Sequence, residues 1–282
     1  MNFFDKMFGN DKASVQHRTP LRLRTLLCRM LIQADIAMYK RDYVRAVECY
    51  RNILKLESNP TVQYNLAILY AQGKGVEQNF MEAAYWLRQC EQGGNAQAGM
   101  WCLKCTWEYI HQNFDEKAPG QLYADMIRFT QYVDADAENI DREACRKLNA
   151  AANNHFYKHE YSASAKIYRA AAEFGYDGYS QTYLAELYNK GTGVEKNDMA
   201  ALYWFDKAME NGAADIAQKQ RDDILNVYKT DLLPSDFYKT MLQLSAWCSV
   251  GSNDIPKDAA KALFWQKIGE QHAWENAQDG LI

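Results

Sequence analysis

The sequence has little proline and no long apolar run. Only 5 of its 282 residues are proline, while 48% are apolar and 24% are charged, a composition typical of an ordered globular chain. No stretch of about 18 or more apolar residues is present, so we expect no membrane-spanning helix. Residues 1–9 lack the roughly 7–15-residue apolar core of a secretory signal peptide. These absences favour a cytoplasmic protein.

The cysteines do not form a disulfide or metal-binding pattern. Seven is an odd number, and without a secretion signal we expect free, buried thiols in a reducing compartment. Cys102 and Cys105 form a Cys-x-x-Cys pair inside a predicted helix, but no second pair has the spacing that zinc requires. We therefore predict buried thiols beside Trp101 and Trp107. The seven cysteines are Cys28, Cys49, Cys90, Cys102, Cys105, Cys145 and Cys248.

Charge is unevenly distributed along the chain. Residues 1–60 hold 11 Lys and Arg against 6 Asp and Glu, whereas the remaining residues hold 21 against 30. The simplest interpretation of the basic stretch is a solvated helix face; a docking patch for an acidic segment or an anionic membrane surface is the alternative. The overall acidic charge argues against nucleic-acid binding. The cations of this stretch include Arg18, Arg22, Arg24, Arg29, Lys40, Arg41, Arg45 and Arg51.

An internal repeat is the strongest feature of the sequence. Residues 66–96 read LAILYAQGKGVEQNFMEAAYWLRQCEQGGNA and residues 184–214 read LAELYNKGTGVEKNDMAALYWFDKAMENGAA, with 15 of 31 positions identical. The shared Leu, Ala and Tyr residues lie on one helix face. Two shared glycines then suit a turn that needs positive φ, and a second helix follows with a shared Ala and Trp. Each unit is therefore predicted to be helix, glycine turn, helix, glycine turn.

The run L-A-x-L-Y-x-x-G-x-G-V followed by A-x-x-W resembles the Sel-one-like repeat, a relative of the tetratricopeptide repeat. A degraded third copy ends in Ala262-Leu263-Phe264-Trp265, and residues 42–50 and 161–175 are similar to plainer tetratricopeptide helices. The resemblance implies an all-α fold, a right-handed α-α superhelical solenoid of about six to seven helix pairs. It also implies an adaptor or scaffold protein, of a kind frequent in bacterial signalling and envelope processes.

We predict thirteen helices. Because the number is odd, one pair must be broken, and we place the break within residues 213–250. Residues 1–17 are expected to be a flexible leader and residues 18–282 a single solenoid, with repeats at 60–96 and 178–214 and the degraded copy at 236–272. The predicted helices cover residues 20–39, 42–56, 60–72, 78–92, 95–113, 121–133, 138–158, 161–174, 178–190, 197–210, 213–229, 236–250 and 258–271.

A stack of helix pairs offers a long concave face lined by the first helix of each pair, which suits the binding of a peptide or helix from another protein. We predict a protein–protein interaction adaptor without a cofactor or metal; the oligomeric state is open. The outward positions on the first helices are the candidate partner-binding residues. They are Leu31, Asp35 and Met38, then Tyr64, Ile68 and Ala71, then Thr182, Glu186 and Asn189.

Alternative functions have weaker support from the sequence. A membrane-proximal adaptor would use Phe3, Phe4, Met7 and Phe8 together with the basic first helices. A hydrolase like some cysteine-rich relatives of this repeat is disfavoured, because the cysteines are irregular and no Ser-x-x-Lys motif is present. His155 and His159 share the i, i+4 spacing of some zinc sites, but His159 falls in a predicted turn, so no metal or catalytic residue is predicted.

Overall fold

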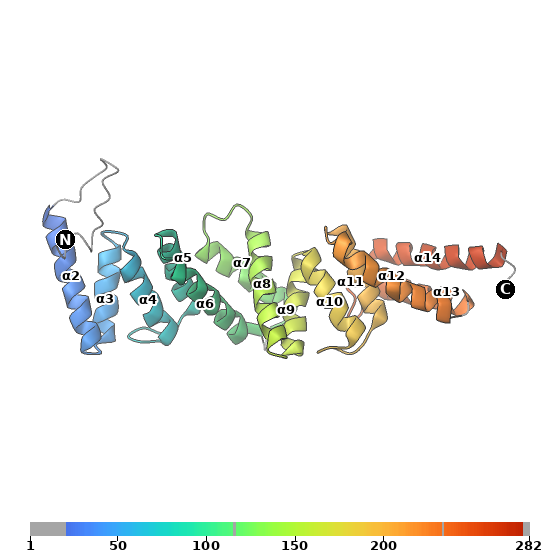
Figure 1. The fold of residues 1–282 in the computed structure, drawn as a ribbon, viewed down its shortest axis with the longest axis horizontal. Coiled ribbons are helices and arrows are strands. Elements are labelled where there is room, and N and C mark those ends of the chain that lie inside the picture. The colour runs from blue at the N-terminus through green and yellow to red at the C-terminus, as the bar shows by residue number, and fades with distance from the viewer. Residues whose placement is uncertain (1–20, 115–116, 233, 279–282) are drawn as a thin grey trace. The chain divides into compact units, whose positions relative to one another are not determined.

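The computed structural model describes residues 21–114, 117–232 and 234–278, and these contain thirteen α-helices and no β-strand (Figure 1). The all-α fold class is confirmed, and the helices lie within a few residues of their predicted bounds, except that the last one was predicted to end at residue 271 and extends to Gln278. None of the described helices is long and apolar enough to span a bilayer. The helices are α2 (Leu21–Tyr39), α3 (Tyr43–Leu54), α4 (Pro60–Gln72), α5 (Phe80–Gln92), α6 (Ala96–Phe114), α7 (Pro119–Val133), α8 (Ile140–Tyr157), α9 (Tyr161–Phe174), α10 (Gly178–Lys190), α11 (Asp198–Glu210), α12 (Ala214–Asp231), α13 (Pro234–Val250) and α14 (Ala259–Gln278).

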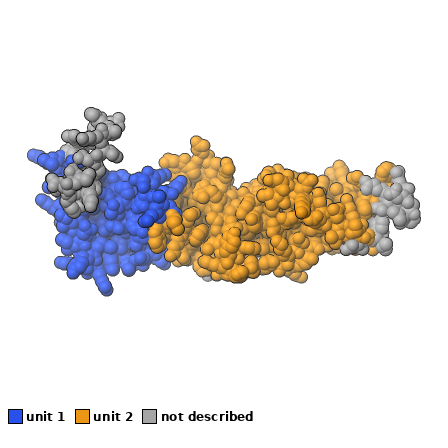
Figure 2. Space-filling view, in the orientation of Figure 1, with its two compact units in different colours: residues 1–99 blue, residues 100–282 orange. Residues whose placement is uncertain are grey.

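The chain divides into two compact units, unit 1 at residues 1–99 and unit 2 at residues 100–282 (Figure 2). Unit 1 carries 13 Lys and Arg against 9 Asp and Glu, and unit 2 carries 19 against 27, so their formal charges have opposite sign. The single solenoid over residues 18–282 stays a prediction. The predicted leader, residues 1–17, lies outside the described residues.

Sequential helices form packed pairs. In unit 1, α2 packs on α3 and α4 on α5; in unit 2, α8 packs on α9, α10 on α11, and α13 on α14. Helix α12 packs chiefly on α11 and barely contacts α13. Helix α12 therefore does not form a pair with α13, while the broken pair predicted within residues 213–250 stays a prediction.

The glycine turns have the predicted geometry. Gly73 ends α4 with φ of 63°, and Gly191 ends α10 with φ of 66°, so both lie in the left-handed region that side chains with a Cβ rarely adopt. The helix that follows each turn is capped by an asparagine: Asn79 Oδ1 accepts from the backbone N–H groups of residues 81 and 82, and Asn197 Oδ1 from that of residue 200. Each turn thus stops one helix and starts the next.

The second glycine of each turn is required by close packing. A Cβ on Gly75 would lie 2.3 Å from the carbonyl carbon of Tyr43, and one on Gly193 would lie 2.4 Å from that of Tyr161. Tyr43 and Tyr161 are the first residues of α3 and α9. The turn of one helix pair therefore sits directly on the start of the second helix of the preceding pair.

The repeat extends further than the sequence comparison indicated. Helices α9, α10 and α11 begin 118 residues after α3, α4 and α5, and α8 ends 118 residues after α2. Even an unusual backbone feature recurs, because Arg41 (φ 60°) and His159 (φ 63°) are both non-glycine residues in the left-handed region. We call α2–α5 the first block and α8–α11 the second block.

The turn of the degraded third copy contacts the second block through Asp254. Its carboxylate accepts from Tyr188 Oη (3.1 Å) and Asn197 Nδ2 (3.0 Å), and its backbone carbonyl accepts from the Trp204 indole nitrogen (3.0 Å). Burial, and then the charge of Asp254, raise the pKa of Tyr188, so this phenol stays protonated and can donate. The turn has lost its glycine pair but keeps its docking position.

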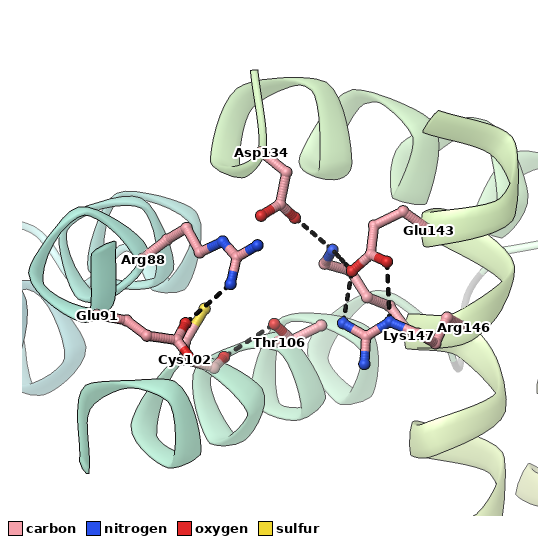
Figure 3. Close-up of polar contacts among 8 residues, drawn as sticks. All are labelled: Arg88, Glu91, Cys102, Thr106, Asp134, Glu143, Arg146 and Lys147. Carbon is pink, nitrogen blue, oxygen red and sulfur yellow. Dashed lines mark hydrogen bonds and ion pairs between the residues drawn. The ribbon is translucent and has the colours of Figure 1, made fainter. Parts of the chain in front are cut away.

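Buried charges in unit 2 are paired. Lys261 on α14 reaches Asp206 on α11 and lies 2.5 Å from Glu210; both Lys261 and Asp206 are buried. On α8, Lys147 is buried and its Nζ lies 2.5 Å from Asp134 and 2.8 Å from Glu143, as Figure 3 shows. Such pairs cost much to break because the remaining charge would be buried alone.

Candidate partner-binding surface

The candidate surface is built from the first helices of the pairs, and α10 shows its construction best. Eight of its thirteen residues are buried, among them Leu184, Ala185, Leu187 and Tyr188. Of the five remaining residues, all but Asn189 form a ridge at i, i+4, i+7 and i+11. We call this the α10 ridge; its residues are Tyr179, Tyr183, Glu186 and Lys190.

Two tyrosines occupy the first half of the α10 ridge. The rings of Tyr179 and Tyr183 lie 4.6 Å apart, and Tyr183 stacks on Tyr168 of α9 at 5.3 Å with an interplanar angle of 12°. Tyr168 is fully buried and donates a hydrogen bond to Asn153 Oδ1 (2.6 Å) on α8. Residues of α8, α9 and α10 therefore hold Tyr179 and Tyr183 in place, and both remain at least partly accessible. We call these two tyrosines the aromatic platform.

The phenol of Tyr183 is held in its neutral form. A hydrogen bond with Tyr179, and then burial, raise the pKa of Tyr183 to about 12. Its hydroxyl therefore stays protonated at physiological pH and can donate or accept a hydrogen bond. The platform offers apolar area together with polar groups, a combination suited to protein recognition.

The second half of the α10 ridge is charged. Glu186 lies 2.9 Å from Lys190 Nζ and accepts a hydrogen bond from Gln220 Nε2 (3.1 Å) on α12. The carboxylate thus links α10 to α12. Its contacts fix the position of Glu186 while leaving the side chain partly accessible.

The nine predicted partner-binding residues differ in how far their side chains are exposed to solvent. On α2, Asp35 is exposed and Leu31 and Met38 are half-buried. The other half-buried residues are Tyr64, Ile68 and Ala71 on α4, and Glu186 and Asn189 on α10. The residues on α2 and α4 belong to unit 1 and those on α10 to unit 2.

The prediction of Thr182 as an outward residue is wrong. Its side chain is buried, and its hydroxyl donates to the backbone carbonyl of Gly178 (2.9 Å). The neighbouring Tyr183 takes the accessible position instead. Tyr179 and Tyr183 were therefore missed by a shift of one position; their i, i+4 spacing was the signal in the sequence that could have identified them.

The first block lacks the aromatic platform. Asn65 is the equivalent of Tyr183, because it stands 118 residues earlier in the chain. Its side-chain amide donates to Tyr50 Oη (3.3 Å), and Tyr50 is the equivalent of Tyr168 in this block. The exposed part of α4 is correspondingly less aromatic. Its accessible residues along the same ridge are Thr61, Asn65, Ile68 and Gln72.

The other constellations considered in the sequence are structural. His155 is buried with Nδ1 2.5 Å from Glu160, whereas His159 lies in the turn with Nδ1 2.7 Å from Tyr161 Oη, so the two histidines have separate partners. Cys102 and Cys105 are buried, and burial raises the pKa of Cys105 to about 11. Over the residues that the structure describes, no cluster of three or more His, Cys, Asp or Glu side chains could hold a metal ion.

The cysteine prediction holds in part. Five thiols are buried, whereas Cys28 and Cys49 are half-buried. All seven are free thiols. None therefore contributes a covalent cross-link to the surface.

Paired helices, left-handed glycine turns and interlocked turns define a helical-repeat protein. The chain carries four Sel1 repeats, matched by the family model at residues 28–52, 60–93, 178–212 and 239–265. The predicted resemblance is thereby confirmed. Sel1 repeats generally mediate protein–protein interactions and generally form non-catalytic scaffolds.

Two solved structures are similar to this chain. One is a Sel1 repeat protein from Oxalobacter formigenes, with 17% identity, a TM-score of 0.27, and coverage of 88% of this chain and 87% of that one. The other is a protective antigen of uropathogenic Escherichia coli strains with an SLR fold, with 17% identity, a TM-score of 0.28, and coverage of 92% of this chain and 56% of that one. No curated protein sequence matches this chain.

Proposed function

We propose that this protein is a non-catalytic adaptor that binds a peptide or helical segment of a partner protein along the concave side of its helix pairs. The α10 ridge carries the proposal. Tyr179 and Tyr183 offer accessible aromatic area on a platform held by α8, α9 and α10. Tyrosine is favoured at interfaces because a large area is buried while few side-chain torsions are fixed.

The charged half of the ridge would set the direction of a bound segment. Glu186 and Lys190 lie one and two turns beyond Tyr183, so an extended or helical segment could contact the platform and the charges together. The predicted residues of α2 and α4, of which Asp35 is exposed and the rest half-buried, would supply further contacts in unit 1. They are Leu31, Asp35, Met38, Tyr64, Ile68 and Ala71.

The test is quantitative affinity capture from the source cell with the full chain as bait. We compare the wild type with Tyr179→Ala/Tyr183→Ala, and use Tyr176→Ala as the control because Tyr176 is an exposed tyrosine outside the ridge. A partner retained by the wild type and the control but lost with the double variant supports the proposal. The loss expected for two interface tyrosines is about tenfold or more in affinity.

Folding must be checked beside binding. The circular dichroism spectrum and melting temperature of the double variant should match the wild type, because Tyr168 beneath the platform is untouched. Equal capture by the wild type and a folded double variant would refute the use of the α10 ridge. Capture of no specific partner by any form would refute the adaptor function itself.

A further inference from the structure

The outer face of α2 is the most unusual surface in unit 1. An amphipathic helix is expected to present mainly polar residues to solvent. Helix α2 instead exposes Ile32 (54%), Ile36 (49%) and Tyr39 (90%), which share one stripe at i, i+4 and i+7. We call this stripe, with Leu26, Arg29 and Gln33 beside it, the α2 outer face.

The edge of the α2 outer face is basic. Arg22, Arg29 and Lys40 are exposed and fall on nearly the same line of the helix, next to the apolar stripe. Asp35 is the only exposed acidic residue of α2. The face therefore combines an apolar stripe with a cationic border.

The second block shows what covers the part of this face around Arg29, while Ala150, Asn154 and Tyr157, the equivalents of the apolar stripe, stay half-buried or exposed. Arg29, Gln33 and Leu26 of α2 match Lys147, Ala151 and Ala144 of α8 at the 118-residue offset, and these three are buried. The carboxylate of Asp134 at the end of α7 lies 2.5 Å from Lys147 Nζ (Figure 3). The ring of His111 on α6 stacks on His155 of α8 at 5.8 Å.

The cover in the second block is thus helical and supplies a carboxylate to the cation at this position. On α2 the matching cation, Arg29, and its neighbours are exposed. We propose that the α2 outer face docks an acidic amphipathic helix of a partner protein, with a carboxylate on Arg29 and apolar side chains on Ile32, Ile36 and Tyr39. This is a second surface, separate from the α10 ridge.

A second copy of the chain fits this face poorly. Two α2 outer faces would bring Arg22, Arg29 and Lys40 against their own copies. Helix α14 can be aligned with α11 by placing Ala262 and Trp265 on Ala201 and Trp204. In this alignment, the exposed Lys267 of α14 stands where α11 has Asp206. The charge of Lys267 therefore also has the wrong sign for Arg29.

The experiment titrates the full-length protein with three fluorescent helical peptides that share one apolar stripe and differ in charge: acidic, neutral and basic. Fluorescence anisotropy at low and high salt reports binding. We expect the acidic peptide to bind most tightly, with an affinity that falls as salt increases. Arg29→Glu should weaken its binding by about tenfold or more.

Matched variants separate charge, apolar contact and folding. Arg29→Lys introduces the residue that the second block has at this position and should bind the acidic peptide like the wild type. Lys55→Glu changes an exposed cation at the end of α3, outside the face, and should also bind like the wild type. Ile36→Asn should weaken binding of all three peptides. Tyr179→Ala/Tyr183→Ala should leave peptide binding unchanged, so failure of this proposal and of the proposed function can be told apart.

Other outcomes would overturn the proposal. Equal binding of the acidic and basic peptides would exclude recognition by charge. Binding to vesicles of anionic lipid that Arg29→Glu abolishes, without binding of the acidic peptide, would assign the face to a membrane surface instead. Concentration-dependent dimerisation that Ile36→Asn abolishes would assign it to a second copy.

Discussion

The two blocks share a backbone framework and differ at their surfaces. Their helices begin or end at a constant offset of 118 residues, and their turn glycines have φ values within a few degrees of each other. Yet the second block carries the tyrosine platform where the first has Asn65, and α8 buries the row of residues around Lys147 that α2 exposes around Arg29. Residues that fix the turns and the packing are retained, and residues on the accessible faces have diverged.

This comparison separates two kinds of tyrosine. Tyr50 and Tyr168 are equivalent and both buried, so packing accounts for their recurrence. Tyr39 and Tyr157 are also equivalent but are 90% and 79% exposed. Packing does not account for a tyrosine that recurs in solvent, which makes these two further candidates for partner contact.

The largest expected effect is common to both blocks. Gly75→Ala and Gly193→Ala should each destabilise the protein by about 3 kcal/mol or more, because a positive φ is strained and the new Cβ overlaps the start of the preceding helix. Chemical denaturation followed by circular dichroism measures the change. Gly212→Ala is the control: it has a positive φ but open space around it, and should cost only about 1 kcal/mol.

If Gly75→Ala and Gly193→Ala cost no more than Gly212→Ala, the interlocking of turn and helix contributes little to stability. A large cost for one and not the other would show that the blocks depend on this contact to different extents. Either result would revise the view that the two frameworks are energetically equivalent.

The second effect is confined to unit 2. Lys261→Met should destabilise the protein by about 3 kcal/mol, since Asp206 would keep its burial and lose its nearest cation. The double variant Lys261→Met/Asp206→Leu should recover most of this loss, because the buried carboxylate is removed with its cation and Arg221, 3.7 Å from Asp206, keeps Asp222 as a partner. Chemical denaturation of the three proteins tests it; a double variant no more stable than Lys261→Met would contradict the explanation.

The smallest effect concerns the docked turn of the third copy. Asp254→Ala removes the acceptor of Tyr188 and Asn197 and should cost about 1–3 kcal/mol. The hydrogen bond from Trp204 goes to the backbone carbonyl and should survive, so the tryptophan fluorescence of the folded protein should change little. Asp236→Ala, an exposed carboxylate in the same unit, should be nearly neutral.

The sequence predicted the framework better than the surface. Helix α9 has the predicted bounds, residues 161–174, and α11 begins one residue later than predicted. The surface prediction failed at Thr182 by one position along α10. Helical periodicity identifies a buried side of a helix but not its width, and α10 is packed on several sides, so only a narrow ridge stays accessible.

The sequence alone determined the helices, the left-handed glycine turns and the repeat, because these depend on local backbone preferences and on apolar spacing within about thirty residues. The tertiary structure decided which equivalent faces are covered. Lys147 is buried on Asp134 and Arg29 is exposed, although both are cations at the same place in the same kind of helix. Burial is set by the neighbours that an element receives, and in a repeat protein those neighbours differ from one position in the stack to the next.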